Sequence, residues 1–279
     1  MSKKFNKQKE QQIIEMYNKG ISQKDIATYF NTFNTSIRRV LLRYNIKIRS
    51  NSELFRIVNR DIFSNLDCTE TNYWLGMLAT DGCVTKKASI VLDLHKNDKY
   101  LLEQFIEFTK APLNLTKTTH YTGIESYRVY FTNYDCVNTL EKYGITRRKS
   151  LTLKLNIPFN FHLLRGIFDG DGSISSYFTI ASASLNFIKQ IEEFLKNNNY
   201  HPTTRTVTEY KKGVKRKNPI YIIALHRKDE LFKLYYDLYS ESYPCLTRKK
   251  DKFGSLLQKW DSEKWAKTVE QIQQYRASK

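Results

Sequence analysis

The chain has 279 residues, a hydrophobic fraction of 41% and a formal net charge of +18, because 46 Lys and Arg outnumber 28 Asp and Glu. That hydrophobic content is enough for packed cores and excludes an intrinsically disordered protein, and the length fits one large domain with a small one. The positive charge is spread along the chain, so we expect a polyanionic partner, with nucleic acid as the first choice. An unusually basic protein without such a partner is the alternative on charge alone.

The cysteine pattern and the apolar segments narrow the setting. Cys68, Cys83, Cys136 and Cys245 are far apart and form no Cys-x-x-Cys pair, which argues against a zinc site and predicts free thiols in a reducing compartment. No apolar run is long enough to span a bilayer, and the N-terminus lacks the apolar core of a signal peptide. We therefore expect a cytoplasmic, nucleoid-associated protein with no membrane partner.

A small all-α module is predicted in residues 1–48. The first of three short helices is expected to stop at Gly20, and Ser22 should cap the second, Gln23–Phe30. Three such helices with a tight turn before the third resemble a helix-turn-helix unit, whose third helix enters the major groove of DNA. The resemblance implies DNA contacts by the outward residues of that helix, namely Thr35, Ser36, Arg38, Arg39 and Arg43. A plain helical bundle packed on the main domain is the alternative.

The remainder of the chain is a duplication, preceded by a basic linker at 49–66 that would track a DNA backbone. The segments Tyr73–Gly82 and Leu163–Gly172 align without a gap, and similar strand and helix patterns follow each. Each half has an αββαββα order, which predicts an α+β fold with two pseudo-symmetric halves, at 67–157 and 158–254, and a C-terminal helix at 255–279.

The patterns that follow the two segments predict these elements. In the first half, we expect strands at Ser89–His95, Leu115–Tyr121 and Tyr127–Thr132 and helices at Asp98–Thr109 and Tyr134–Tyr143. In the second half, we expect strands at Tyr177–Ala183, Thr203–Tyr210 and Ile220–His226 and helices at Leu185–Asn197 and Lys228–Tyr239.

Small residues within the two repeated segments indicate that the segments pack together as helices. Gly76 with Thr80, and Gly166 with Gly170, lie four residues apart and so on one helix face, which lets two backbones approach closely. The glycines that close both segments are expected to cap the two helices at their C-terminal ends.

The last two residues of each segment are an aspartate and a glycine, namely Asp81-Gly82 and Asp171-Gly172. A carboxylate at the negative end of a helix dipole is disfavoured by roughly 0.3–1 kcal/mol, and two such carboxylates that converge also repel each other. A divalent cation would neutralise both. Asp169 is a weaker candidate for a symmetric ligand, because its counterpart in the first segment is Ala79.

The two segments resemble the paired dodecapeptide motifs of single-chain LAGLIDADG homing endonucleases, and the resemblance covers about 67–253. It implies a monomeric, free-standing enzyme that cleaves both strands of a long double-stranded DNA target on a saddle formed by the two sheets. It also implies Mg²⁺ or Mn²⁺ held by Asp81 and Asp171, with Gly82 and Gly172 in the metal site. Trp74 and Leu75 depart from the family pattern, which we expect to alter core packing only.

The resemblance further implies one basic residue near each scissile phosphate. Lys149 and Lys249 are the first choices, because each follows an Arg in a matching context near the end of its half. Lys250 stays open as the alternative to Lys249, since alignment on the preceding threonine favours it. Solvated basic loops are an equally good interpretation of both segments.

Further DNA contacts are expected from the strands and from a basic hairpin tip. Apolar and polar residues alternate in Tyr127–Thr132, which predicts one buried face and one polar face. The expected contacts are Arg128, Tyr130, Thr132, Arg205, Lys211, Lys212, Lys215, Arg216 and Lys217. The matching tip of the first half lacks this charge, so we expect the halves to hold their half-sites unequally. Two other functions remain open, an intron RNA maturase and a DNA-binding transcription regulator that has lost cleavage.

Overall fold

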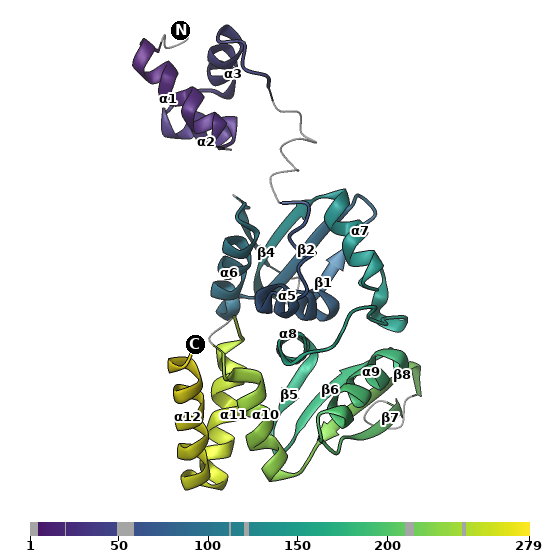
Figure 1. Ribbon diagram of the computed structural model, residues 1–279. Coiled ribbons are helices and arrows are strands. Elements are labelled where there is room, and N and C mark those ends of the chain that lie inside the picture. The colour runs from purple at the N-terminus through teal and green to yellow at the C-terminus, as the bar shows by residue number, and fades with distance from the viewer. Residues whose placement is uncertain are drawn as a thin grey trace.

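The computed structural model describes residues 5–19, 21–48, 59–111, 113–119, 123–209, 215–241 and 244–279. The N-terminal module consists of helices α1 (Lys7–Asn18), α2 (Gln23–Tyr29) and α3 (Asn34–Arg43), and Figure 1 shows them grouped at one end of the molecule. Apolar residues from all three helices form a hydrophobic cluster of their own. Ser22 accepts a hydrogen bond from the Asp25 amide, which confirms the predicted cap. The predicted stop at Gly20 lies outside the described residues.

The first repeat unit is a four-stranded antiparallel sheet with its helices. Its elements are α5 (Thr69–Thr80), β1 (Gly82–Val84), β2 (Ser89–His95), η2 (Lys96–Asp98), α6 (Lys99–Thr109), β3 (Leu115–Thr119), β4 (Glu125–Thr132) and α7 (Tyr134–Lys142). The strand order is β1-β2-β4-β3, so the strand that follows α6 forms the edge and β4 lies inside it. Leu92 of β2 pairs with Gly82 on one side and Val129 on the other, which fixes the register of the three strands.

The second repeat unit has the same topology. A short 3₁₀ turn, η3 (Lys149–Leu151), precedes it. Its elements are α8 (Phe161–Asp171), β5 (Gly172–Ile174), β6 (Phe178–Ser182), α9 (Leu185–Asn197), β7 (Thr203–Glu209), β8 (Lys215–Leu225) and α10 (Lys228–Tyr239), and the strand order is β5-β6-β8-β7. The α+β class and the duplicated αββαββα order predicted from the sequence are therefore confirmed.

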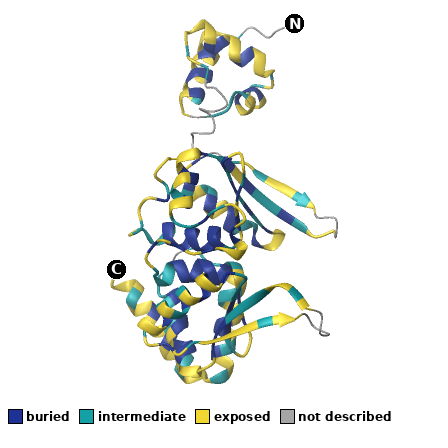
Figure 2. Ribbon diagram, turned by 90° about the vertical axis from the view of Figure 1, so that its right-hand side faces the viewer, coloured by how far each residue is buried: buried dark blue, intermediate teal, exposed yellow. Residues whose placement is uncertain are grey.

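Helices α5 and α8 lie side by side in the middle of the molecule, between the two sheets (Figure 1). The run 71–79 of α5 is buried without interruption, as is expected of a helix covered on all sides. Trp74 is completely buried and its ring centroid lies 4.9 Å from that of Phe105, so the departure from the family pattern is absorbed by core packing, as predicted. Figure 2 shows that the β3–β4 and β7–β8 hairpins extend to the same side of the molecule.

The C-terminal region differs from the single helix expected at 255–279. Helix α11 (Thr247–Trp260) and helix α12 (Ser262–Ala277) are separated at Asp261, which is extended (φ −158°, ψ 98°). The Asp261 side chain accepts a hydrogen bond from the Lys264 amide and so starts α12 as an N-cap. The second helix then folds back, and the Trp265 ring packs 4.9 Å from the Tyr235 ring of α10. None of the described helices has the length and apolar character needed to cross a membrane.

Candidate active site on the paired motif helices

The two motif helices touch through their backbones. A Cβ atom on Gly76 would lie 2.9 Å from the Cα of Gly166 and would overlap the carbonyl oxygen of Leu163. A Cβ atom on Gly166 would overlap the Tyr73 carbonyl oxygen in the same way. The small residues predicted to allow close approach are therefore at the contact itself, and the contact brings the C-terminal ends of α5 and α8 together.

The predicted C-cap position is taken by Gly172 but not by Gly82. Asp81 is the C-cap of α5, and Gly172, the C-cap of α8, is extended with φ −85° and ψ 160°. Neither position has room for a side chain. A Cβ atom on Gly82 would lie 2.6 Å from the Cα of Leu78, and one on Gly172 would lie 2.8 Å from the Cα of Phe168. Each glycine is the first residue of a strand, so the chain passes directly from motif helix to sheet.

Asp81 and Asp171 face a common region at these helix ends. Both residues are exposed, yet partial desolvation by the surrounding protein raises the pKa of Asp81 to about 6, and the negative charge of Asp171 adds to the rise. Burial is also the cause that raises the pKa of Asp171. Because the charge of one carboxylate disfavours ionisation of the other, the two are a suitable pair of ligands for a divalent cation, whose charge would relieve the repulsion.

The donor set fits such a cation only if other oxygens complete it. Among the residues that the structure describes, no cluster of three or more His, Cys, Asp or Glu side chains is able to hold a metal ion. The carbonyl oxygens of Gly82 and Gly172 accept hydrogen bonds from Lys149 and Lys249, so these glycines belong to the site but face ammonium groups. The two carboxylates are therefore the better ligands, and the phosphate oxygens of a bound nucleic acid would supply the remainder.

Lys149 is directed to the end of α5. Its Nζ donates to the carbonyl oxygens of Gly82 and Thr80, the latter at 3.4 Å, and the side chain is buried. Burial lowers the pKa of Lys149, and the nearby charges of Asp171 and Asp81 oppose this effect.

Lys249 takes the matching position at the end of α8. Its Nζ lies 2.7 Å from the carbonyl oxygens of both Phe168 and Asp169 and 2.6 Å from that of Gly172. Burial lowers the pKa of Lys249 to about 8. Lys250 instead lies over the ring of Tyr239, 5.7 Å from its centroid, so the motif is reached by Lys249.

The lysine that follows the first repeat unit lies near the aspartate of the second motif, and the lysine that follows the second repeat unit acts on the aspartate of the first. A hollow of about 230 Å³ is lined by Lys149, which precedes the second unit, and by Asp171 from the second motif. In agreement, Lys149 opposes the rise of the Asp171 pKa more than Lys249 does, whereas Lys249 has the larger effect on the pKa of Asp81. Sequence reasoning missed Ser150 and Ser182, which also line this hollow, because neither falls in a motif.

Asp169 has a structural position, in keeping with its unmatched place in the motif. It is 1% exposed, and its Oδ2 accepts hydrogen bonds from the Tyr73 hydroxyl at 2.9 Å and from the Leu246 amide at 2.7 Å. Burial raises its pKa to about 6. The second unit thus uses this carboxylate to hold the start of α11 against the motif helices.

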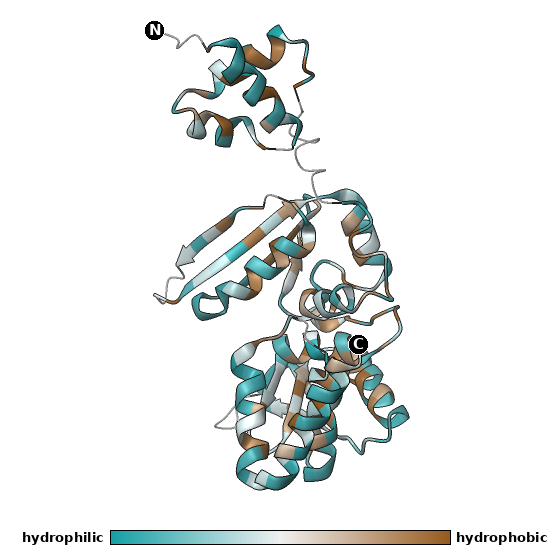
Figure 3. Cartoon of the chain, turned by 60° about the vertical axis from the view of Figure 1, so that its left-hand side comes forward, coloured by the Kyte–Doolittle hydropathy of each residue, from teal (hydrophilic) through white to brown (hydrophobic). Residues whose placement is uncertain are grey.

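The polar face predicted for β4 is present beside the site. Val129 and Phe131 are buried and Tyr130 is 53% exposed, and the alternation is visible along the strand in Figure 3. Arg128 is half exposed but is ion-paired with Asp93 of β2 at 2.6 Å. The hydroxyls of Thr132 and Ser89 share a hydrogen bond of 2.7 Å.

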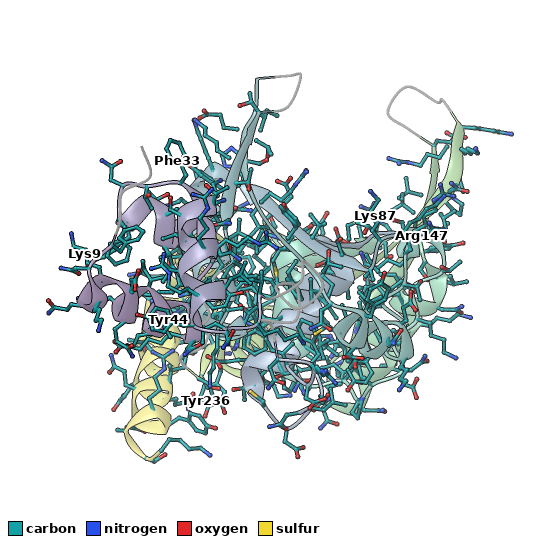
Figure 4. The ribbon with its side chains drawn as sticks, turned by 90° about the horizontal axis from the view of Figure 1, so that it is seen from above. Lys9, Phe33, Tyr44, Lys87, Arg147 and Tyr236 are labelled. Atoms are coloured by element: carbon teal, nitrogen blue, oxygen red, sulfur yellow. The ribbon has the colours of Figure 1, made fainter. Side chains whose placement is uncertain are left out.

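The second sheet presents the more strongly basic hairpin. Arg205, Lys215 and Lys217 are exposed and Arg216 is half-buried, whereas Lys211 and Lys212 lie outside the described residues. Strand β7 is exposed along almost its whole length. In Figure 4 the strands of the two hairpins rise on the same side of the molecule, and Tyr236 of α10 lies on the opposite side.

In the N-terminal module, the outward residues of α3 differ from those expected. Thr35, Arg38 and Arg39 are exposed as predicted. Ser36 is wrong as a contact residue, because it is only 6% exposed and lies beside the buried apolar stripe of its helix. Arg43 forms an ion pair with the buried Glu10 of α1, so it holds the two helices together while its side chain stays 61% exposed.

The comparison with protein families agrees with this geometry. Residues 158–235 match the model of the LAGLIDADG-like domain family, a segment that contains α8 and the whole second sheet. The solved structure of the homing endonuclease I-WcaI bound to its DNA recognition sequence aligns with a TM-score of 0.48 and 15% identity, over 76% of this chain and 96% of that chain. The N-terminal LAGLIDADG domain of DUF199/WhiA aligns with a TM-score of 0.43 and 12% identity, over 74% and 98%. The comparison with curated proteins finds no match.

Proposed function

We propose that this chain, which carries a LAGLIDADG-like domain at residues 158–235, is a metal-dependent, site-specific endonuclease of double-stranded DNA that acts as a monomer. The observation that carries the proposal is the pairing of Asp81 with Asp171 at the joined ends of α5 and α8, where the negative charge of Asp171 helps to raise the pKa of Asp81. Structural packing does not require two carboxylates there, and their mutual repulsion disfavours them unless a cation binds.

The residues of the chain have distinct roles in this mechanism. Asp81 and Asp171 would hold Mg²⁺ or Mn²⁺ together with phosphate oxygens of the DNA. When bound, the divalent cations supply Lewis-acid stabilisation of the phosphate charge and lower the pKa of water. Lys149 and Lys249 are fixed by the helix-end carbonyls and present positive charge to each phosphate as its negative charge grows in the transition state.

Binding of the duplex is assigned to the surface between the hairpins. A second hollow, of about 500 Å³, is lined by residues that include Lys86, Lys87, Arg128 and Tyr130. These side chains combine donors for phosphates with an exposed ring for base contacts. We assign an additional contact to the exposed Thr35, Arg38 and Arg39 of α3, which would lie in a major groove beside the cleavage site.

The test uses a duplex built by joining the DNA that flanks the coding sequence, with both strands end-labelled. We expect double-strand cleavage in Mg²⁺ and binding without cleavage in Ca²⁺. Asp81→Asn and Asp171→Asn should each abolish cleavage and retain binding, whereas Asp67→Asn, at an exposed site before α5, should cut like the wild type. Tight binding by the wild type with no cutting in any divalent cation would instead support a DNA-binding regulator.

A further inference from the structure

Each lysine contacts the motif helix of one repeat unit, while the segment that carries it is hydrogen-bonded to the other unit. Lys149 contacts the end of α5 and its segment is bonded to the second unit, whereas Lys249 contacts the end of α8 and its segment is bonded to the first. Lys149 lies between the two units, and the residues that follow it run along α9. Lys249 lies in the first turn of α11, after the second unit, and the residues that precede it meet the start of α6.

The Lys249 segment is tied to the first unit. The hydroxyl of Tyr100, in the first turn of α6, accepts a hydrogen bond from the Thr247 amide at 2.7 Å and donates one to the Cys245 carbonyl at 3.1 Å. Asp98, the N-cap residue of the same helix, is 3% exposed and receives the Arg248 guanidinium at 3.1 Å. Two residues at the start of one helix of the first unit thus hold the positions around Arg248, and Lys249 follows directly.

The Lys149 segment is tied to the second unit by matching means. The hydroxyl of Ser184, the N-cap residue of α9, is buried and donates to the Leu153 carbonyl at 2.6 Å. Gln190 of α9 donates to the Leu155 carbonyl at 2.6 Å and accepts from the Leu155 amide at 2.9 Å. The N-cap residue and a polar residue of the equivalent helix therefore do in the second unit what Asp98 and Tyr100 do in the first.

We propose that Tyr100 and Asp98 are positioning residues for Lys249, and that Gln190 and Ser184 are positioning residues for Lys149, so that each lysine enters the site only when the opposite unit is docked. The inference rests on the proposed function for the role of the lysines, but the fastening itself is independent of it. Asp169, which bonds to the Leu246 amide, adds a tie from the second unit to the Lys249 segment alone. The Lys149 segment lacks that carboxylate, since Ala79 takes its place in the first motif.

Tyr100→Phe and Gln190→Met form a matched pair of test variants. Both keep the size of the side chain and remove only its hydrogen bonds, so both should fold. Loss of an amide acceptor should raise hydrogen exchange about tenfold at Thr247 in Tyr100→Phe and at Leu155 in Gln190→Met. Each variant should leave the other's amide unchanged, and the pair therefore control for one another.

Cleavage of the end-labelled duplex supplies the second measurement. Lys249→Met and Lys149→Met first define which strand depends on each lysine. Tyr100→Phe should then slow the strand that depends on Lys249 by about tenfold, and Gln190→Met should slow the other strand, so that nicked DNA accumulates in both.

The outcomes separate this inference from the proposed function. Unchanged exchange at Thr247 and Leu155, or equal slowing of both strands by each variant, would overturn the positioning role. If exchange changes as expected while the wild type cuts no DNA, the fastening stands and the endonuclease proposal fails.

Discussion

Replacement of Asp81 by Asn should stabilise the protein in the absence of metal. The pKa of Asp81 is raised from 3.8 to about 6, first by desolvation and then by the charge of Asp171. A raised pKa means that the folded state binds the proton more tightly than the unfolded state does. The stabilisation of the folded state by the protonated Asp81 is therefore complete below about pH 3.8, and it is lost as the pH rises through about 6 and the carboxylate ionises.

The magnitude follows from the size of this shift and from exposure. One pH unit corresponds to ~1.4 kcal/mol. Asp81 is exposed, however, so solvent screening reduces the effect, and we expect the free energy of unfolding to rise by about 1–2 kcal/mol in Asp81→Asn at pH 7. Asn is also well tolerated at the end of a helix, so the substitution adds no strain of its own.

The assay is urea unfolding in EDTA at several pH values, followed by tryptophan fluorescence, since Trp74 is buried within the first motif helix. The gain in Asp81→Asn should be present above pH 6 and absent at pH 3.5, and Asp67→Asn should show none. Added Ca²⁺ should stabilise the wild type more than the variant. A wild type that is as stable as Asp81→Asn at pH 7, or a gain that does not depend on pH, would refute the assigned electrostatics.

Three further outcomes are expected. Gly76→Ala should lower the free energy of unfolding, measured in urea, by about 1–3 kcal/mol, because its Cβ would overlap the backbone of α8. In Gly170→Ala the Cβ would meet the Thr80 side chain, so the free energy of unfolding should fall by less. Removal of residues 1–50 should weaken binding in a gel-shift assay yet leave cleavage at high enzyme concentration, and a folded truncation that never cuts would contradict this. Neutralising Lys215 and Lys217 to Gln should reduce the magnitude of the log–log salt slope of binding by about 0.9 for each phosphate that is no longer neutralised, and an unchanged slope would assign these residues to a solvated tip.

The repeat makes most of the fold predictable from the sequence. Helices α9 and α10 have the expected limits, Leu185–Asn197 and Lys228–Tyr239, because each has an apolar stripe and begins shortly after a strand ends. The predicted αββαββα order requires a strand directly after each motif helix, but the sequence does not locate strands β1 and β5. Each has three residues, and each exists only because it pairs with the strand that follows it, which local patterns do not record.

The site is predictable where it depends on the motif and not where it depends on tertiary contacts. The placement of Asp81 and Asp171 follows from the alignment of the two segments, and the approach of Lys149 and Lys249 is expected from the resemblance. The prediction for Ser36 is wrong because, in a ten-residue helix, an error of one position is enough to move a residue from the exposed face to the buried one. The contacts of Tyr100 with the Lys249 segment join residues about 145 positions apart, and no sequence pattern points to them.

The hydrogen bonds of Lys149 and Lys249 to the ends of the motif helices have an evolutionary consequence. These ammonium groups donate hydrogen bonds to carbonyl oxygens at the close of α5 and α8, so their loss should lower the stability of any descendant, whether or not it still cuts. The aspartates bring no such benefit to folding. When selection for cleavage is relaxed, the carboxylates should therefore disappear from the lineage before the lysines do. A basic residue retained at either lysine position is consequently a poor marker of an active descendant, and the acidic pair is the informative one.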